Sequence, residues 1–193
     1  MIRILFVDDH PALRAGLEAV LRSEPGLVPV GSASGDADVW HKIEATRPDV
    51  VLLDYHLPGA DGVALCRRIK RVMPPPAVVL YSAYADAKLA IPAVLAGADG
   101  LVHKSAPAPE LFDALRRAAR GESALPPIGR EQLDDATSLI DPQDLPILGM
   151  LIEGTDRADI PGTLGLEPGE FANRLDRMIG ALSVDVPAAR ASR

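Results

Sequence analysis

The sequence predicts an α/β protein in which a doubly wound parallel sheet of five strands precedes a small all-α domain. Residues 1–120 alternate short apolar runs with amphipathic stretches, which is the pattern of successive strand–helix–strand units. The apolar runs are uninterrupted, as expected for strands buried on both faces. Beyond residue 120 the apolar residues keep helical spacing only, which indicates the second domain.

Five strands and their connecting helices follow in order along the first domain. The expected strands lie at residues 2–7, 27–30, 50–53, 77–81 and 100–102. Pro11 suits the first turn of the helix after the first strand, and Pro107 and Pro109 suit the start of the last helix. Pro92 falls inside the fourth helical pattern, residues 86–96, where we expect it to kink or shorten the helix.

Composition and charge exclude several classes of protein. The 193 residues carry 27 acidic and 20 basic side chains, a formal net charge of −7, which gives no general attraction to nucleic acid or an anionic membrane. Cys66 is the one cysteine, which excludes an internal disulfide framework and fits a reducing compartment. No apolar run approaches the roughly 18 residues of a membrane span, and the amino terminus has no signal-peptide pattern. We therefore expect a cytoplasmic protein without a membrane partner.

Chemically active side chains occur where the predicted strands end. Asp8 and Asp9 follow the first strand, Asp54 the third, Ser82 the fourth and Lys104 the fifth. An aspartate after a strand is, taken alone, more often a helix cap or a turn residue. Here all five positions fall at the carboxyl edge of the sheet, which is where such sheets bind ligands. Three neighbouring carboxylates repel one another, so the pattern predicts a hard cation such as Mg²⁺ beside a fixed positive charge.

Residues 1–120 resemble the receiver domain of bacterial two-component response regulators. The resemblance is carried by Asp8-Asp9, by VVLLDYHLPGADG around Asp54, by LYSAYAD around Ser82 and by GADGLVHKS around Lys104. It implies a flavodoxin-like fold and phosphorylation of Asp54 by a sensor histidine kinase. It also implies that the chain is not an enzyme, beyond accepting and slowly hydrolysing its own aspartyl phosphate.

The resemblance implies a role for each residue of the cluster. Asp9 would bind Mg²⁺ directly and Asp8 through water, while the phosphoacceptor itself and the backbone carbonyl of His56 would supply further contacts. Ser82 would donate a hydrogen bond to a phosphoryl oxygen after activation. Lys104 would pair with another phosphoryl oxygen, in keeping with the need of phosphoryl transfer for positioning and charge neutralisation.

The sequence departs from the receiver pattern in the region that usually reports phosphorylation. Leu101 stands where family members usually carry an aromatic switch residue, three positions before the lysine. Tyr84 and His56 occupy positions that border the phosphoryl group in receivers, although both could equally be solvent-facing loop residues. Pro92 lies in the helix of the usual signalling face. We expect an intact phosphorylation site with an unusual readout.

The remaining chain divides into a linker, a helical module and a tail. Residues 121–138 lose the apolar periodicity and contain two adjacent prolines, which predicts a semi-rigid linker. Residues 139–184 hold three helical patterns and resemble a LuxR-type helix-turn-helix output, through LPILGMLIEG and EPGEFANRLDRMIGALSV. Residues 185–193 are expected to be a flexible tail.

The charge of this module leaves its output open. Residues 130–193 contain six arginines, no lysine and twelve acidic residues, whereas phosphate contacts come mainly from basic side chains. Relatives often place basic residues at the positions of Ala172 and Asp176. If the module binds DNA, we expect a phosphorylated homodimer that uses Asn173, Arg174 and Arg177. The alternative is a degenerate output that acts through protein–protein contact or dimerisation, or that holds the receiver inactive.

Two further interpretations compete with a phosphorylated receiver. Haloacid-dehalogenase-like phosphatases also use a strand-end aspartate and magnesium, but they need a second acid two residues after the nucleophile, where this chain has His56. A receiver-like domain used only for dimerisation would not need the complete set of acids, hydroxyl and lysine.

Overall fold

The computed structural model describes residues 1–57, 60–83, 85 and 87–182. Its five-stranded parallel sheet has the order β2-β1-β3-β6-β7, so the predicted α/β fold is confirmed. These strands are β1 (Ile2–Val7), β2 (Leu27–Ala33), β3 (Val50–Asp54), β6 (Ala77–Ser82) and β7 (Gly100–His103). A two-stranded antiparallel pair, β4 (His56–Leu57) and β5 (Ala60–Asp61), follows β3.

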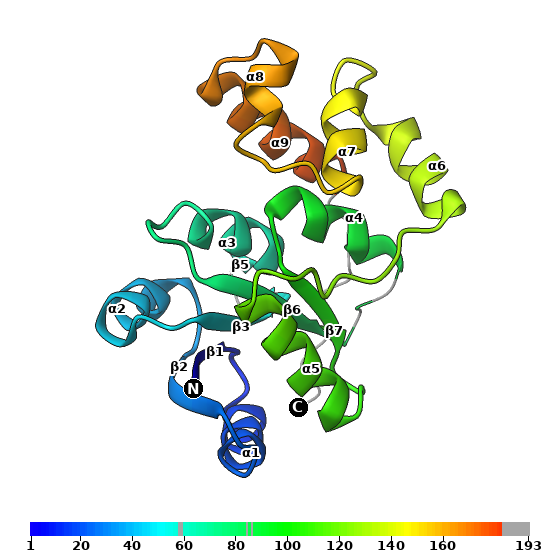
Figure 1. The fold of residues 1–193 in the computed structure, drawn as a ribbon. Helices are drawn as coiled ribbons and strands as arrows, with labels where there is room; N and C mark the ends of the chain where they lie inside the picture. The colour runs from blue at the N-terminus through cyan, green and yellow to red at the C-terminus, as the bar shows by residue number, and fades with distance from the viewer. Residues whose placement is uncertain (58–59, 84, 86, 183–193) are drawn as a thin grey trace.

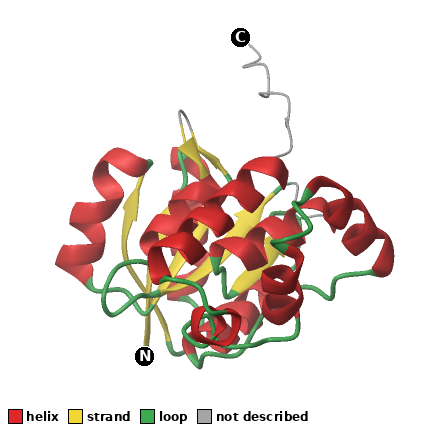
Figure 2. Cartoon of the chain, turned by 90° about the horizontal axis from the view of Figure 1, so that it is seen from above, coloured by secondary structure: helices red, strands yellow, loops and turns green. Residues whose placement is uncertain are grey.

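Helices cover both faces of the sheet (Figure 2). One face packs against α1 (Pro11–Arg22) and α5 (Ala108–Ala119). The other packs against α2 (Asp36–Thr46), α3 (Gly62–Ile69) and α4 (Ala87–Ala96). The predicted helix starts at Pro11 and near Pro107 agree with these bounds.

The central strand β3 shows why the apolar runs are uninterrupted. Val51 and Leu53 lie in the hydrophobic cluster that contains α2, α3 and α4. Val50 and Leu52, which alternate with them, lie in the cluster on the α1 and α5 face. Successive side chains of a strand point to opposite faces, so both sets are buried and both must be apolar.

Two elements differ from the sequence prediction. Strand β2 continues to Ala33, three residues beyond the expected end. Helix α4 runs from Ala87 to Ala96 through Pro92, so the expected shortening is wrong, while the expected kink stays a prediction. Leu89 and Leu95, on either side of the proline, are both buried, and this tertiary packing holds the helix together despite the missing amide donor.

Beyond α5, the described residues form four further helices. They are α6 (Arg130–Leu139), α7 (Leu145–Ile152), α8 (Ile160–Leu164) and α9 (Pro168–Leu182). Helix α6 lies in the second half of residues 121–138, for which the sequence predicts a linker. Part of this segment is therefore helical. The side chain of Gln132 accepts a hydrogen bond from the Gly129 amide, which caps the start of α6, and Ala136 is buried against the rest of the chain. The predicted tail lies outside the described residues, as do Pro58, Gly59 and Tyr84.

Helices α6, α7 and α9 pack on α4, which lies between them and the sheet (Figure 1). Their apolar side chains belong to the same continuous hydrophobic cluster as α2, α3 and α4. The fully or nearly fully buried members of this cluster from α7, α8 and α9 are Ile147, Leu148, Leu151, Ile160, Phe171, Leu175, Met178, Ile179 and Leu182. Among the described residues, no helix has the length and apolar character needed to cross a membrane.

The first part of the linker extends the sheet edge. The Ala124 amide donates to the Asp99 carbonyl at 2.7 Å, and the Leu101 amide donates to the Ala124 carbonyl at 3.3 Å. A Cβ atom on Gly100 would lie 3.1 Å from the Ala124 Cβ, so a glycine permits this close approach. Residue 124 is therefore bound to β7 before the chain turns towards α6.

Candidate functional site

The sheet topology brings four of the sequence-predicted residues to one edge. Asp54 and Ser82 are the last residues of the adjacent strands β3 and β6, while Asp8 and Lys104 directly follow β1 and β7. Asp8, Asp54 and Ser82 are buried, with exposed fractions of 3%, 3% and 0%. These polar groups therefore interact with little competition from bulk water.

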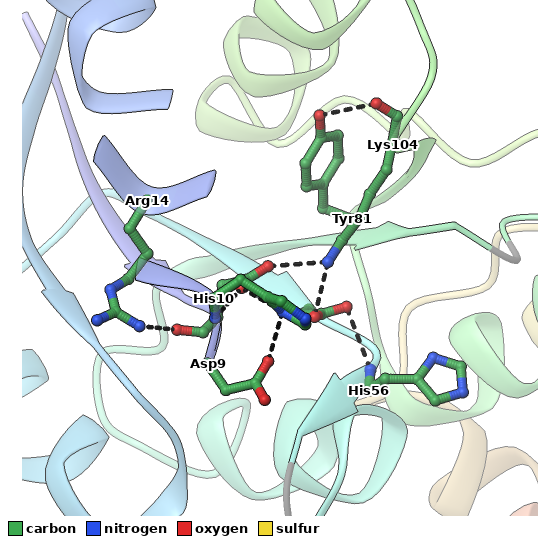
Figure 3. A network of polar contacts seen from close by, with 8 residues as sticks. Asp9, His10, Arg14, His56, Tyr81 and Lys104 are labelled. Atoms are coloured by element: carbon green, nitrogen blue, oxygen red, sulfur yellow. Dashed lines mark hydrogen bonds and ion pairs between the residues drawn. The ribbon is translucent and has the colours of Figure 1, made fainter. Parts of the chain in front are cut away.

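Lys104 connects two of the carboxylates (Figure 3). Its Nζ lies 2.8 Å from Oδ2 of Asp8 and 2.7 Å from Oδ2 of Asp54. The backbone carbonyl of Lys104 accepts a hydrogen bond from the Tyr81 hydroxyl at 3.2 Å, which helps to fix the turn after β7. Lys104 is thus held beside the end of β3 by contacts of its ammonium and of its backbone carbonyl.

The three groups shift one another's pKa values. Burial raises the pKa of Asp54, and the hydrogen bond from Lys104 only partly offsets this rise. Burial acts in the same direction on Asp8, but the hydrogen bonds from Lys104 and from the His10 amide outweigh it, so the pKa of Asp8 is lowered. Burial lowers the pKa of Lys104, but its hydrogen bonds to the two carboxylates outweigh this effect and raise it. Lys104 therefore stays charged at neutral pH.

Asp9 and His10 lie beside Asp8 and Asp54, and these four residues are called the acidic cluster below. The Nδ1 atom of His10 lies 2.7 Å from Oδ1 of Asp9 and 3.2 Å from Oδ1 of Asp8. Oδ1 of Asp9 is shielded from water, and among the described residues no group donates a well-aligned hydrogen bond to it. A shielded carboxylate oxygen without such a donor is an available ligand for a cation.

The donor set fits a divalent cation. Ligand atoms of Asp8, Asp9, His10 and Asp54 all lie within 4.8 Å of one another, a span that one ion can bridge. Three carboxylates face the one ammonium of Lys104, which leaves negative charge for a cation to neutralise. Oxygen donors of this kind suit Mg²⁺, which keeps several waters and uses only one or two carboxylates directly.

Sequence reasoning missed His10 and Arg14 as neighbours of the site. The guanidinium of Arg14 donates a hydrogen bond to the backbone carbonyl of Asp8, which ties the first turn of α1 to the end of β1. Position alone could have indicated His10, because it follows the acid pair and precedes Pro11 at the helix start. The contact of Arg14 depends on the angle at which α1 leaves the sheet, which the residue pattern does not specify.

The turn after β3 holds Asp54 from the other side. The His56 amide donates to Oδ1 of Asp54 at 3.2 Å, and the His56 ring packs edge-on against Tyr55. Gly62, the first residue of α3, donates its amide to the Tyr55 carbonyl at 2.9 Å. A Cβ atom on Gly62 would lie 2.5 Å from the Asp54 carbonyl oxygen, so this turn requires glycine.

Two of the three residues of the predicted switch region, Leu101 and Pro92, lie in the part of the chain that the structure describes. Leu101 is 7% exposed on β7 and belongs to the hydrophobic cluster of the α3 and α4 face. Pro92 is on α4, next to the C-terminal helices. Tyr84 lies outside the described residues. Position 101 therefore holds a buried aliphatic side chain.

The three possible DNA-contact residues lie on α9, and two of them are paired within the module. Arg177 contacts Oδ2 of Asp144 at 2.8 Å, and Arg174 contacts Oδ1 of Asp144 at 3.3 Å. Asp144 is fully buried, whereas Asn173 is exposed. The arginine side chains are 59% and 19% exposed, for Arg177 and Arg174 respectively, so each retains some access to solvent.

Comparison with known proteins agrees with this architecture. Residues 4–116 match the model of the response regulator receiver domain family. The chain is 30% identical to the DNA-binding transcriptional activator DevR/DosR of Mycobacterium tuberculosis, over 96% of this chain and 90% of that protein. It is also similar to a crystal structure of a LuxR-family two-component response regulator from Aurantimonas sp. SI85-9A1, with a TM-score of 0.63 and 30% identity over 71% of this chain and 99% of that one.

A second solved structure covers nearly the whole chain. The response regulator ChrA of a heme-sensing two-component system has a TM-score of 0.57 and 29% identity, over 95% of this chain and 91% of that one. The chain therefore belongs to the response regulator family. It is a two-component response regulator of the LuxR type, in which a receiver domain controls a helix-turn-helix output module in transcription regulation.

Proposed function

We propose that Asp54 is the phosphoacceptor and that a sensor histidine kinase is the donor. The observation that supports this most directly is the contact of Lys104 with both Asp54 and Asp8 beside the shielded oxygen of Asp9. In the transfer, a carboxylate oxygen of Asp54 forms a bond to phosphorus as the bond from phosphorus to the kinase histidine breaks. The protein positions the groups and neutralises charge, as phosphoryl transfer requires.

The metal requirement follows from the charge of the pocket. Asp8, Asp9 and the backbone carbonyl of His56 would hold Mg²⁺, together with Asp54 itself. Bound Mg²⁺ supplies charge neutralisation for the phosphoryl oxygens. Lys104 and Ser82 then stabilise the aspartyl phosphate, whose slow hydrolysis is the only turnover that we propose for this chain.

The described helices offer a route from the site to the output. Helix α4 contacts β7 of the sheet and, on its other side, α6, α7 and α9. We propose that phosphorylation acts on the output through α4, because Leu101 cannot serve as an aromatic switch. Homodimerisation after phosphorylation belongs to the same proposal, as does the cytoplasmic location.

The output of the module is a proposal with two forms. Operator binding by a dimer through Asn173, Arg174 and Arg177 is supported by the relative named as a DNA-binding activator. The pairing of Arg174 and Arg177 with the buried Asp144 favours the second form, which acts through protein contacts. The phosphatase interpretation has no comparable support, because position 56 offers Asp54 a backbone amide and a ring packed on Tyr55.

Labelling with acetyl phosphate in the presence and absence of Mg²⁺ tests the phosphoacceptor. We expect a base-labile mass increase that needs Mg²⁺ and disappears in Asp54→Asn. Asp61→Asn is a matched control, because Asp61 caps α3 through the Val63 amide and lies outside the acidic cluster. Full labelling of Asp54→Asn, or of the wild type in excess chelator, would contradict the proposal.

A further inference from the structure

Helix α9 contacts the receiver through Ala172 and Asp176. The carboxylate of Asp176 pairs with Arg67 at 2.8 Å and with Arg71 at 3.1 Å, both on or just after α3. The backbone carbonyl of Ala172 accepts a second hydrogen bond from Arg67, at 3.1 Å. Positions 172 and 176 lie one turn apart, so one face of α9 is used for this contact. A basic residue at 176 would repel both arginines.

The cations of α9 are directed away from that face and into the module itself. Arg174 and Arg177 both contact Asp144, which precedes α7, and Arg174 also pairs with Glu170 at 2.6 Å. Buried Asp144 needs such partners, because an unpaired buried carboxylate is costly. The positive charges that DNA would require thus stabilise the packing of α9 on α7.

A third contact joins the loop before α8 to the end of α4. The guanidinium of Arg157 donates to the carbonyls of Val94 and Leu95, at 2.8 Å for Leu95, where a helix end leaves carbonyls unpaired. Burial lowers the pKa of Arg157 to about 10. Gly97 has φ of +86°, and a Cβ there would lie 3.2 Å from Nε of Arg157. The absence of a side chain at Gly97 therefore leaves room for Arg157 at the end of α4.

These contacts surround an apolar core that runs without interruption from the sheet through α4 into α7, α8 and α9. Permanent interfaces are larger and more apolar than transient ones, and they resemble a domain core cut in half. An effector can shift the equilibrium between two conformations only by the difference in its affinity for them. This usually changes the affinity of a distant contact by about 5- to 150-fold. Loss of a core-like contact needs a larger change.

We propose that α9 is a receiver-binding helix. The second part of the proposal is that the receiver and the C-terminal helices form one cooperative folding unit. The third part is that the contact between α9 and the receiver persists when Asp54 is phosphorylated. The last part rests on the proposed function. The first two parts do not, because they concern the unphosphorylated chain. In this arrangement the partner of the α9 face formed by Ala172 and Asp176 is α3 of the same chain, and phosphorylation alters the shape of the whole unit rather than releasing a module.

Equilibrium urea unfolding of the full chain tests the cooperativity. Trp40, the one tryptophan, is in α2 of the receiver and reports that domain by fluorescence, whereas far-ultraviolet circular dichroism reports all helices. We expect the two transitions to coincide, as they do in a two-state unit. An earlier loss of helical signal, while Trp40 fluorescence is unchanged, would overturn the proposal.

Charge reversal tests the surface itself. In Asp176→Arg we expect the amides of α9 to exchange with solvent about fivefold faster, which corresponds to the upper end of the range for one exposed ion pair. Glu167→Arg makes the same charge change before α9 and should leave exchange within about twofold. Arg67→Asp combined with Asp176→Arg restores opposite charges and should recover most of the protection. Equal exchange in Asp176→Arg and Glu167→Arg, or no recovery in the double variant, would overturn the assignment.

Beryllofluoride with Mg²⁺ separates the two proposals. Its binding is followed by ¹⁹F resonance, and α9 exchange is measured on the same sample. We expect a bound ¹⁹F signal and a change in α9 exchange below about fivefold. A larger increase in the presence of that signal overturns persistence of the contact. Absence of any bound signal contradicts the proposed function instead, and the urea experiment still decides whether the folding unit is single.

Discussion

Lys104 lies 2.7 Å from Asp54, the residue whose chemistry it would serve, and it contacts Asp8 at 2.8 Å at the same time. The ammonium therefore compensates two buried carboxylates before any phosphoryl group arrives. From the sequence alone Lys104 would be a residue of the phosphorylated state. The structure gives it a second role, which is to stabilise the resting fold.

Lys104→Ala should destabilise the metal-free protein by about 1–3 kcal/mol at pH 7, because two buried carboxylates lose their partner. The effect depends on pH. The lowered pKa of Asp8 adds stability above its ordinary value of 3.8, and this stability is lost as the pH falls. The raised pKa of Lys104 adds stability below 10.5, and this stability is lost as the pH rises. The difference between wild type and variant should therefore be largest between these limits, in urea titrations at several pH values.

Lys42→Ala is the control for the Lys104 experiment. It removes a partly exposed ammonium from α2 that makes no ion pair with the described residues, and it should change the free energy of unfolding by less than about 0.5 kcal/mol. A Lys104→Ala effect that is equally small, or that does not vary with pH, would show that the two carboxylates do not depend on this lysine.

Asp9→Asn should separate metal binding from stability. Mg²⁺ at about 100 times its Kd should stabilise the wild type by about 2.7 kcal/mol, and the variant should need much more Mg²⁺ for the same rise in Tm. Without metal, Asp9→Asn should be slightly more stable than wild type, by on the order of 1 kcal/mol or less, because it removes a repulsive charge. Glu44→Gln, on an exposed part of α2, should bind Mg²⁺ as wild type does. Unchanged Mg²⁺ dependence in Asp9→Asn would exclude Asp9 as a ligand.

Gly62→Ala should be strongly destabilising for a one-methyl change. The added Cβ would lie 2.5 Å from backbone atoms of Asp54 and Tyr55, so the turn after β3 must move, at a cost of about 2–3 kcal/mol. Labelling of Asp54 should fall as well. Gly16→Ala in α1 meets nothing within 4 Å and should stabilise the protein by about 0.5–1 kcal/mol. Similar thermal stabilities for the two variants would contradict this account of Gly62.

Asp144→Asn should change the behaviour of the chain towards DNA. We expect the wild type to bind random duplex no tighter than about 10⁻⁶ M at moderate salt, with a shallow salt dependence. The asparagine releases charge from Arg174 and Arg177, so the slope of log affinity against log salt should steepen, by up to about 0.9 for each arginine that reaches a phosphate. Anisotropy titrations at several salt concentrations measure both quantities.

Asp141→Asn makes the same charge change three residues away, at an exposed position that caps the Gln143 amide. If DNA contact is limited by the pairing of Arg174 and Arg177 with Asp144, and not by net charge, Asp141→Asn should leave the slope of log affinity against log salt unchanged. Nanomolar binding by the wild type with a steep salt slope would instead support an ordinary operator-binding output.

The sequence was sufficient to predict the features that depend on local residue patterns. Uninterrupted apolar runs predicted the buried parallel strands, and the carboxyl-edge rule predicted that Asp54 and Lys104 would meet. Pro92 was misleading, because burial of Leu89 and Leu95 keeps α4 intact where propensity alone favours interruption. Helix α6 was missed, because its residues are mostly polar and the cap supplied by Gln132 is weak as a sequence pattern.

The long-range charge contacts could not be predicted. Arg67 and Asp176 are 109 residues apart, and their meeting depends on the angle at which α9 lies across α3. The same holds for Arg157 at the end of α4. In each case the sequence supplied a charged residue on a helix or loop, and the tertiary arrangement determined whether it contacts an opposite charge, as Arg67 does, or backbone carbonyls, as Arg157 does.

The pairing of Ala124 with β7 has a consequence for how such proteins diversify. Receivers and outputs are often pictured as interchangeable parts joined by a tether of adjustable length. Here the connecting segment begins as an added edge of the sheet, and only residues 125–129 separate it from α6. If a foreign output domain replaced the chain from residue 121 onwards, β7 would lose its pairing with Ala124. If the replacement began at residue 130, that pairing would be kept, and it would fix the direction in which the chain leaves the sheet. Recombination at this joint is thus constrained by the receiver, and a replacement module must bring its own surface to fit α4.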